Sequence, residues 1–236
     1  MRLAYRTALF GGALLLMWQT HLAWWAVLLF LGVSWWGYQT QAIVKTVKSS
    51  FVITVLGSIL IIGALLGNDG GWGRSSVIIL LIALYYLLLG LSNLIFVRKR
   101  LIYGIAHTGI IYAGLVVIQE AIMGSTKGIW VGDFAVWLFI MLMIRESMEF
   151  ENISPKQSLI FGGVGAFITA EIAWMLNFFP LTSIQWGGIL ALFVVALERA
   201  LKASAEGRLN LREGLKQALI FTFIALVILA TATWEI

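Results

Sequence analysis

The sequence predicts an all-α integral membrane protein, a polytopic helical bundle of about nine transmembrane helices that forms a single domain over 1–236. Three observations predict this class. The chain is 61% apolar and only 11% charged, and its mean hydropathy is +0.97, far above that of soluble proteins. Its apolar residues form continuous runs of spanning length instead of the short alternating segments of a membrane barrel. Its basic residues gather in every second connection between these runs.

The apolar runs define the expected helices. They lie at about 5–19, 22–43, 50–67, 75–97, 101–122, 129–147, 155–179, 183–201 and 213–233. If all nine cross a bilayer, fourteen of the sixteen basic residues fall on one side and only Arg74 and Lys127 on the other. Because basic residues mark the cytoplasmic side, we expect the N-terminus in the cytoplasm and the C-terminus outside. The first run has an apolar core of only about 12 residues, so eight spans with an N-terminal surface helix is the alternative.

The connections and the tryptophans agree with this arrangement. No connection exceeds about 13 residues, so we expect no soluble domain and a multi-pass protein of the cytoplasmic membrane. Most tryptophans fall at expected helix ends, as in the aromatic belts of membrane proteins. Those at outer ends are Trp18, Trp24, Trp25, Trp72, Trp130, Trp186 and Trp234, and those at an inner end are Trp35 and Trp36.

Two helix starts are marked by their residues. Ser154 precedes Pro155 and is followed three positions on by Gln157, a pattern typical of a capping box with proline at the first helical position. Thr182 and Gln185 repeat the spacing at the start of the eighth run. We therefore predict well-defined starts for the seventh and eighth helices.

Glu171 is the main candidate for a binding residue, because it lies about 16 residues into the seventh run, where a carboxylate is costly. One face of this helix carries small or polar side chains, at Gly162, Ala166, Thr169, Ala173 and Asn177. At about 100° per residue, Glu171 points to the opposite face, among bulky residues such as Phe167 and Trp174. The small face predicts a close helix contact. We expect protein neighbours on both faces, and Glu171 is either a functional group or a hydrogen-bonded packing residue.

Asp133 and Glu120 lie near the outer ends of neighbouring helices, on either side of the turn at 124–128. Together with Glu171 they are candidates for an acidic pocket that opens outward. The alternative is that Asp133 and Glu120 are interfacial, with Lys127 as a counter-ion and Asp133 favoured by the helix dipole.

His107 lies about one and a half turns into the fifth run and follows Tyr103 by one turn. It is a further binding candidate, although a hydrogen-bonded structural imidazole is the default interpretation. His21 is expected at the opposite surface, so the two histidines do not predict a shared metal or haem. We expect neither a metal site nor a cofactor.

Several partners and chemistries are excluded. The net charge of +5 resides in short turns beside the membrane, where anionic lipid headgroups are the nearest partners, so we expect membrane lipids and no nucleic acid. The absence of cysteine excludes disulfides and thiolate chemistry. The turn from Arg145 to Glu151 holds an acidic cluster in which Arg145 and Glu149 have the spacing of a helical ion pair.

The segment from Glu171 to Pro180 is followed by another apolar run, by a basic turn at Gly207-Arg208-Leu209 and by a last run ending near Trp234. This C-terminal third resembles a family of uncharacterised polytopic membrane proteins of candidate-phyla bacteria. The resemblance implies a membrane architecture and a role for Glu171, but no reaction.

Two classes of function fit these observations, and whether the protein is an enzyme stays open. The first is an accessory or assembly subunit or a small carrier of the cytoplasmic membrane, with protein partners or a homo-oligomer, in which Glu171 is the central intramembrane polar residue. The second is an intramembrane enzyme that acts on a lipid-linked or envelope precursor at the outer face. A carrier or an enzyme predicts a polar cavity around the carboxylates, whereas a protein with only a scaffold role predicts none.

Overall fold

The protein is mainly helical in the computed structural model, which describes residues 2–39, 48–66, 78–79, 81–86, 99–123, 129–208 and 211–231, and these contain no strand. The predicted all-α class is therefore confirmed. The helices are α1 (Arg2–Gln19), α2 (Trp24–Gln39), α3 (Lys48–Leu66), α5 (Lys99–Met123), α6 (Ile129–Phe150), α7 (Pro155–Leu176), α8 (Ser183–Ala205) and α9 (Leu211–Ala230). The chain forms two compact units, Met1–Ile110 and Ile111–Ile236, which are described separately.

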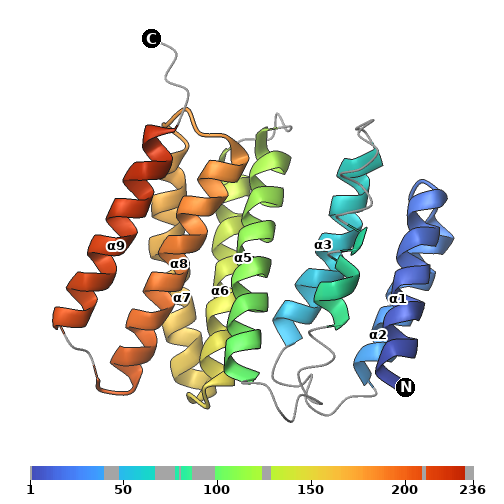
Figure 1. Cartoon of the computed structure of the whole chain (residues 1–236), viewed down its shortest axis with the longest axis horizontal. Helices are drawn as coiled ribbons and strands as arrows, with labels where there is room; N and C mark the ends of the chain where they lie inside the picture. The colour runs from blue at the N-terminus through green and yellow to red at the C-terminus, as the bar shows by residue number, and fades with distance from the viewer. Residues whose placement is uncertain are drawn as a thin grey trace. The chain divides into compact units, whose positions relative to one another are not determined.

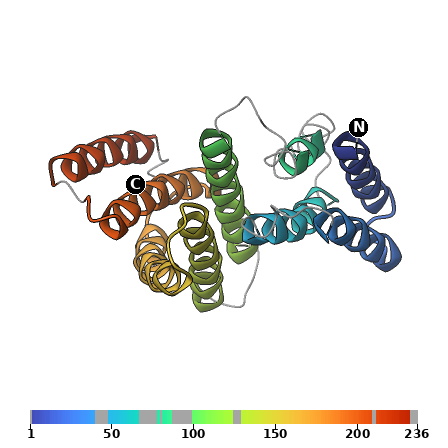
Figure 2. The same ribbon diagram turned by 90° about the horizontal axis from the view of Figure 1, so that it is seen from below.

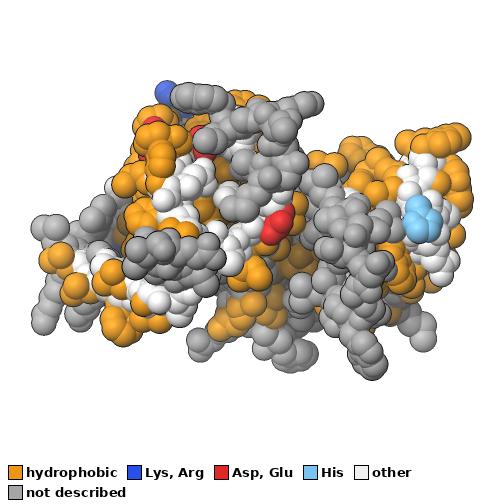
Figure 3. All heavy atoms as spheres, turned by 90° about the horizontal axis from the view of Figure 1, so that it is seen from above, with side chains coloured by type: hydrophobic (Ala, Val, Ile, Leu, Met, Phe, Trp, Pro, Cys, Tyr) orange, Lys and Arg blue, Asp and Glu red, His pale blue; other side chains and the backbone are white. Residues whose placement is uncertain are grey.

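Three of the described helices are long and apolar enough to cross a membrane, namely Leu101–Glu120, Pro155–Leu176 and Ser183–Ala205. Shorter apolar helices occur at Trp24–Gly37, Ser49–Ile59 and Phe221–Ala230. Hydrophobic side chains also cover much of the described surface on the face seen in Figure 3. The count of nine spans and their orientation stay predictions.

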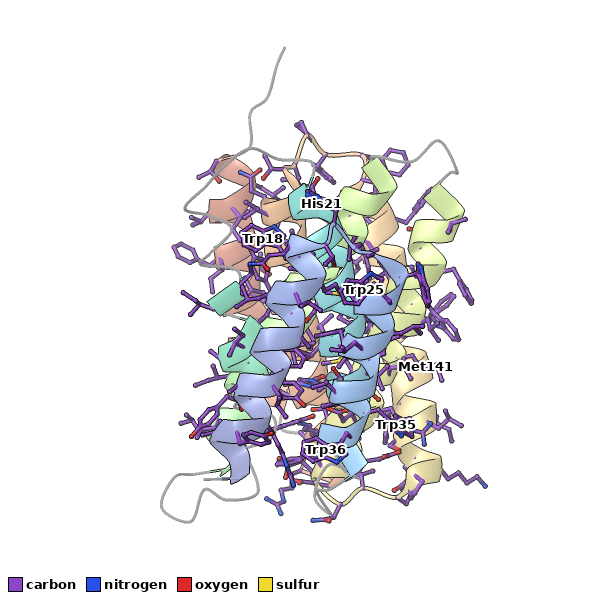
Figure 4. All side chains as sticks on the ribbon, turned by 90° about the vertical axis from the view of Figure 1, so that its right-hand side faces the viewer. Trp18, His21, Trp25, Trp35, Trp36 and Met141 are labelled. Atoms are coloured by element: carbon purple, nitrogen blue, oxygen red, sulfur yellow. The ribbon has the colours of Figure 1, made fainter. Side chains whose placement is uncertain are left out.

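In the first unit, α1 and α2 form a helical hairpin with a tight turn. His21 and Leu22 adopt positive φ values of 50° and 61°, and the Leu22 N–H donates to the carbonyl five residues earlier, which closes the end of α1. Trp18 lies near this turn, whereas Trp35 and Trp36 lie at the other end of α2 (Figure 4). The tryptophans of the hairpin thus occupy its two ends.

Large aromatic side chains fill the core of the first unit. The Tyr85 ring stacks on Phe10 with 3.7 Å between ring centroids, and it also contacts Phe51 from α3 at 5.8 Å. Phe30 from α2 packs on Phe10 at 5.1 Å. These rings join α1, α2, α3 and the helical segment at 81–86.

In the second unit, α6 and α7 pack closely, α7 and α6 contact α8, and α9 packs on α8 (Figure 1). Figure 2 shows α6 and α7 side by side from a second direction. A Cβ at Gly162 would lie only 3.0 Å from the Met141 carbonyl oxygen, so the missing side chain lets the two backbones approach. Gly162, Ala166, Thr169 and Ala173 are all buried, which confirms the predicted small-residue contact.

Both predicted helix caps are present in the second unit. At Thr182 the capping box is complete, since the hydroxyl accepts from the Gln185 N–H and the Gln185 side chain accepts from the Thr182 N–H at 3.1 Å. At Ser154 the hydroxyl accepts from the Gln157 N–H, while the Gln157 side chain accepts the hydroxyl proton of Ser154 instead. These caps fix the register of α7 and α8.

Candidate functional site

Asp133 on α6 and Glu171 on α7 line one partly open cavity of about 300 Å³, together with Ala170 and Trp174. Asp133 is the fifth residue of α6, and Glu171 lies five residues before Leu176, the last residue of α7. At a rise of about 1.5 Å per residue, both lie roughly 6–8 Å from the same end of the antiparallel pair. The close packing of α6 on α7 therefore brings the two carboxylates together.

The face of α7 that carries Glu171 is exposed. Glu171 itself is exposed, and its neighbours Phe167 and Met175 are 60% and 57% exposed. The expectation that both faces of this helix contact protein neighbours is therefore wrong for the chain alone. The physical reason is that the glycine-rich face of α7 is occupied by α6 and α8, whereas its bulky face turns away from them.

The electrostatics of the pair are unfavourable in isolation. Both carboxylates line the same cavity, so two like charges share a site in which Asp133 is half-buried. In the part of the chain that the structure describes, neither forms an ion pair. Lys127, the predicted counter-ion of Asp133, lies outside the described residues together with the rest of the turn at 124–128.

This arrangement can bind a proton, a cationic side chain or a hydrogen-bond donor from another molecule. Two adjacent carboxylates offer four acceptor oxygens, and the Trp174 indole adds a flat apolar wall. No group of three or more His, Asp or Glu side chains suited to a metal ion occurs in the described segments. The absence of a metal site stays a prediction.

The other two predicted binding residues lie elsewhere. Glu120 is exposed near the end of α5 and does not line the acidic cavity. His107 is 3% exposed and belongs to the first unit. Its Nδ1 lies 3.2 Å from the Tyr103 hydroxyl oxygen and the rings stack at 5.1 Å, so the imidazole is hydrogen-bonded as the spacing predicts. The structure thus brings together two of the four candidates.

Glu198 is a buried carboxylate that the sequence did not single out. Glu198 is 6% exposed, and its Oε2 accepts a hydrogen bond of 3.1 Å from Ser147 on α6. The available signal was the buried stripe of α8, because Glu198 follows Val194 and Ala191 at helical spacing. At the same end of α6, the predicted ion pair is present, with Arg145 Nε 2.8 Å from a Glu149 carboxylate oxygen.

A second polar contact links α5 to the end of α7 that is near Glu171. Gln119 is 3% exposed, and its Nε2 donates to Oδ1 of Asn177 over 3.3 Å. Asn177 is the C-cap of α7. The contact therefore fixes the end of the helix that carries the acidic cavity.

Comparison with known protein families finds a match that includes the residues of this site. Residues 98–232, more than half of the chain, match the model of a family described as a protein of unknown function, DUF5656. The chain belongs to this family. The resemblance suggested by the C-terminal third is thereby confirmed and extends over a longer segment, which includes both Asp133 and Glu171. No curated protein and no solved structure matches the chain.

Proposed function

We propose that this protein is an accessory or assembly subunit of the cytoplasmic membrane, and that it binds a partner membrane protein through the acidic face of α6 and α7. We define the acidic face as Asp133, Glu171 and the exposed residues Phe167, Trp174 and Met175. The observation that carries the proposal is the exposed Glu171 on an otherwise apolar helix surface. In the nine-span arrangement, this surface faces lipid in the outer half of the bilayer.

An exposed acid within a membrane is costly. A carboxylate costs several kcal/mol in the hydrocarbon unless it is protonated, paired or hydrated. Asp133 and Glu171 line one cavity, so their negative charges add, and neither is paired with a cation in the part of the chain that the structure describes. A Lys or Arg side chain on a helix of a partner would neutralise this charge, while its apolar residues cover the exposed aromatic ring of Phe167.

A second copy of the chain does not supply that cation. Its basic residues lie at the expected cytoplasmic helix ends, apart from Arg74 and Lys127 in the expected outer turns. A second copy would therefore bring no basic residue within the outer half of an expected span. The partner is a different protein with a basic residue in the outer half of a transmembrane helix.

Cross-linking in native membranes tests this proposal. The chain has no cysteine, so Phe167→Cys introduces a unique thiol on the acidic face for a photoactivatable probe. Phe223→Cys on α9 is the matched control, since Phe223 is 68% exposed compared with 60% for Phe167. We expect one adduct of defined mass from Phe167→Cys and none of that mass from Phe223→Cys.

Reversing the charge of Glu171 provides the second part of this test. Glu171→Arg should reduce the Phe167→Cys adduct by about tenfold, equivalent to about 1.4 kcal/mol, because it places two cations together. An acidic substitution of the basic residue in the partner should restore the adduct. Adducts that contain only lipid or a second copy of this chain, or that are unaffected by Glu171→Arg, would contradict the proposal.

The cavity itself favours a second candidate function. Asp133 and Glu171 next to the Trp174 indole resemble, in chemical terms, an acid and base pair beside a platform for a lipid-linked precursor. An enzyme of this kind predicts that Asp133→Asn causes a lipid-linked envelope precursor to accumulate, while the Phe167→Cys adduct is unchanged. The subunit proposal predicts instead that Asp133→Asn leaves the level of the precursor unchanged and reduces the Phe167→Cys adduct.

A further inference from the structure

A second cavity, of about 420 Å³, lies between α2 and α3 in the first unit. Its size falls within the range of about 300–1,000 Å³ that is typical of small-ligand sites. Leu31 and Trp35 from α2 and Phe51 and Val55 from α3 contribute to an almost wholly apolar lining. Among the residues that line it, Ser34 is the one with a side-chain hydroxyl.

The Ser34 hydroxyl differs from the other buried serine and threonine hydroxyls described in this unit. Serine and threonine within helices commonly donate to the carbonyl one turn earlier. Thr54 and Ser58 on α3 do so, over 2.7 and 2.6 Å. Ser34 is 1% exposed, yet its Oγ has no hydrogen-bond partner in the described part of the chain. A buried hydroxyl without a partner costs free energy, so a ligand that brings a hydrogen-bond acceptor to it is stabilised.

The position of Ser34 along α2 defines the kind of acceptor. Ser34 lies five residues before Gln39, the end of α2, which is roughly 7.5 Å along the helix axis. Trp35 and Trp36 mark this end of the helix (Figure 4). The guanidinium carbon of Arg6 lies 5.6 Å from the centroid of the Trp36 ring, so a cation is present at the same end. The cavity therefore joins an apolar interior to a cationic, tryptophan-rich boundary.

We propose that the α2–α3 cavity binds one acyl chain of an ester-linked glycerophospholipid, with the Ser34 hydroxyl donating to the ester carbonyl. The apolar lining accommodates the chain, and an ester carbonyl is the acceptor that lies between the hydrocarbon and the headgroup of a bilayer. Arg6 is placed to attract the lipid phosphate. This site is separate from the acidic face and does not depend on the function proposed for it.

Lipid retention by the full-length protein tests the site. The protein is purified in a mild detergent, and its bound lipids are extracted and quantified by mass spectrometry. We expect Ser34→Ala to lower the retained phospholipid by about fivefold, which corresponds to the loss of one hydrogen bond. Ser58→Ala is the matched control, because Ser58 is equally buried but bonds to a backbone carbonyl and does not line the cavity. It should leave retention unchanged.

A second measurement identifies the acceptor. The protein is presented with diester and diether phospholipids that have the same chains and headgroup, and with a free fatty acid of the same chain length. We expect the wild-type chain to prefer the diester about fivefold over the diether, and Ser34→Ala to lose this preference. Val55→Trp, which fills the cavity, should abolish binding of both lipids. Equal binding of diester and diether by the wild-type chain, or Ser34-dependent retention of the fatty acid in place of the phospholipid, would overturn the assignment.

Discussion

The two units of this protein are packed by opposite means. The first is filled by large rings, with Phe10, Phe30 and Tyr85 stacked between helices, and it retains an apolar cavity with an unpaired Ser34 hydroxyl. The second depends on glycine at helix contacts, which brings backbones together. Across the contact between α6 and α8, Ser147 donates to Glu198. Stacked rings thus join helices of the first unit through their side chains, whereas glycine lets helix backbones of the second unit approach each other.

The two candidate sites also lie in different units of the chain. The acidic face lies within the family segment at 98–232, whereas the α2–α3 cavity lies outside it. The family match therefore bears on the segment with the acidic face and not on the α2–α3 cavity. The proposed lipid site lies in the first unit, so the two proposals can be tested independently.

The largest effect is expected where backbones touch. Gly162→Leu forces a side chain against the Met141 carbonyl, so we expect the free energy of unfolding to fall by about 3 kcal/mol. The measurement is unfolding by SDS titration in mixed micelles. Gly163→Leu is the control, since a Cβ at Gly163 meets nothing within 4 Å. Equal losses for both variants would show that α6 and α7 are not in close backbone contact.

The corresponding change in the first unit should have a smaller effect. A Cβ at Gly37 would overlap the Tyr85 hydroxyl, and the Tyr85 ring is held by its stack on Phe10. We expect Gly37→Ala to lower the thermal midpoint and to cost about 2 kcal/mol. Gly57→Ala has no atom within 4 Å of its Cβ and should be neutral or slightly stabilising, because alanine favours helix. A neutral Gly37→Ala would contradict the ring packing described for Tyr85.

The smallest expected effects come from alanine substitutions of buried serines, one from each unit. Ser147→Ala removes the donor to Glu198, and we expect a loss of about 1 kcal/mol in the free energy of unfolding. Ser34→Ala removes no hydrogen bond within the described chain, so its loss in lipid-free detergent should be within about 0.5 kcal/mol. If both variants lose the same stability, the contrast between paired and unpaired hydroxyls does not hold.

Some contacts could be predicted because they depend on local spacing. The pairing of Arg145 with Glu149 and of Tyr103 with His107 follows from their spacing of four positions along a helix. The caps at Ser154 and Thr182 follow from side chains within three residues of the helix start. The meeting of Asp133 with Glu171 was proposed only as one alternative, because 38 residues separate them along the chain and their register depends on the turn between α6 and α7.

By itself, the sequence determined the helical class, the helix starts and the division of α7 into a small face and a bulky face, because these depend on composition and on a period of about 3.6 residues. Only the tertiary structure decided which faces are covered. It placed Glu171 on an exposed surface beside Asp133, buried Glu198 against Ser147 and left Ser34 in a cavity. The physical reason is that these helices are largely apolar on every face, so hydrophobicity does not distinguish a face that contacts another helix from one that does not.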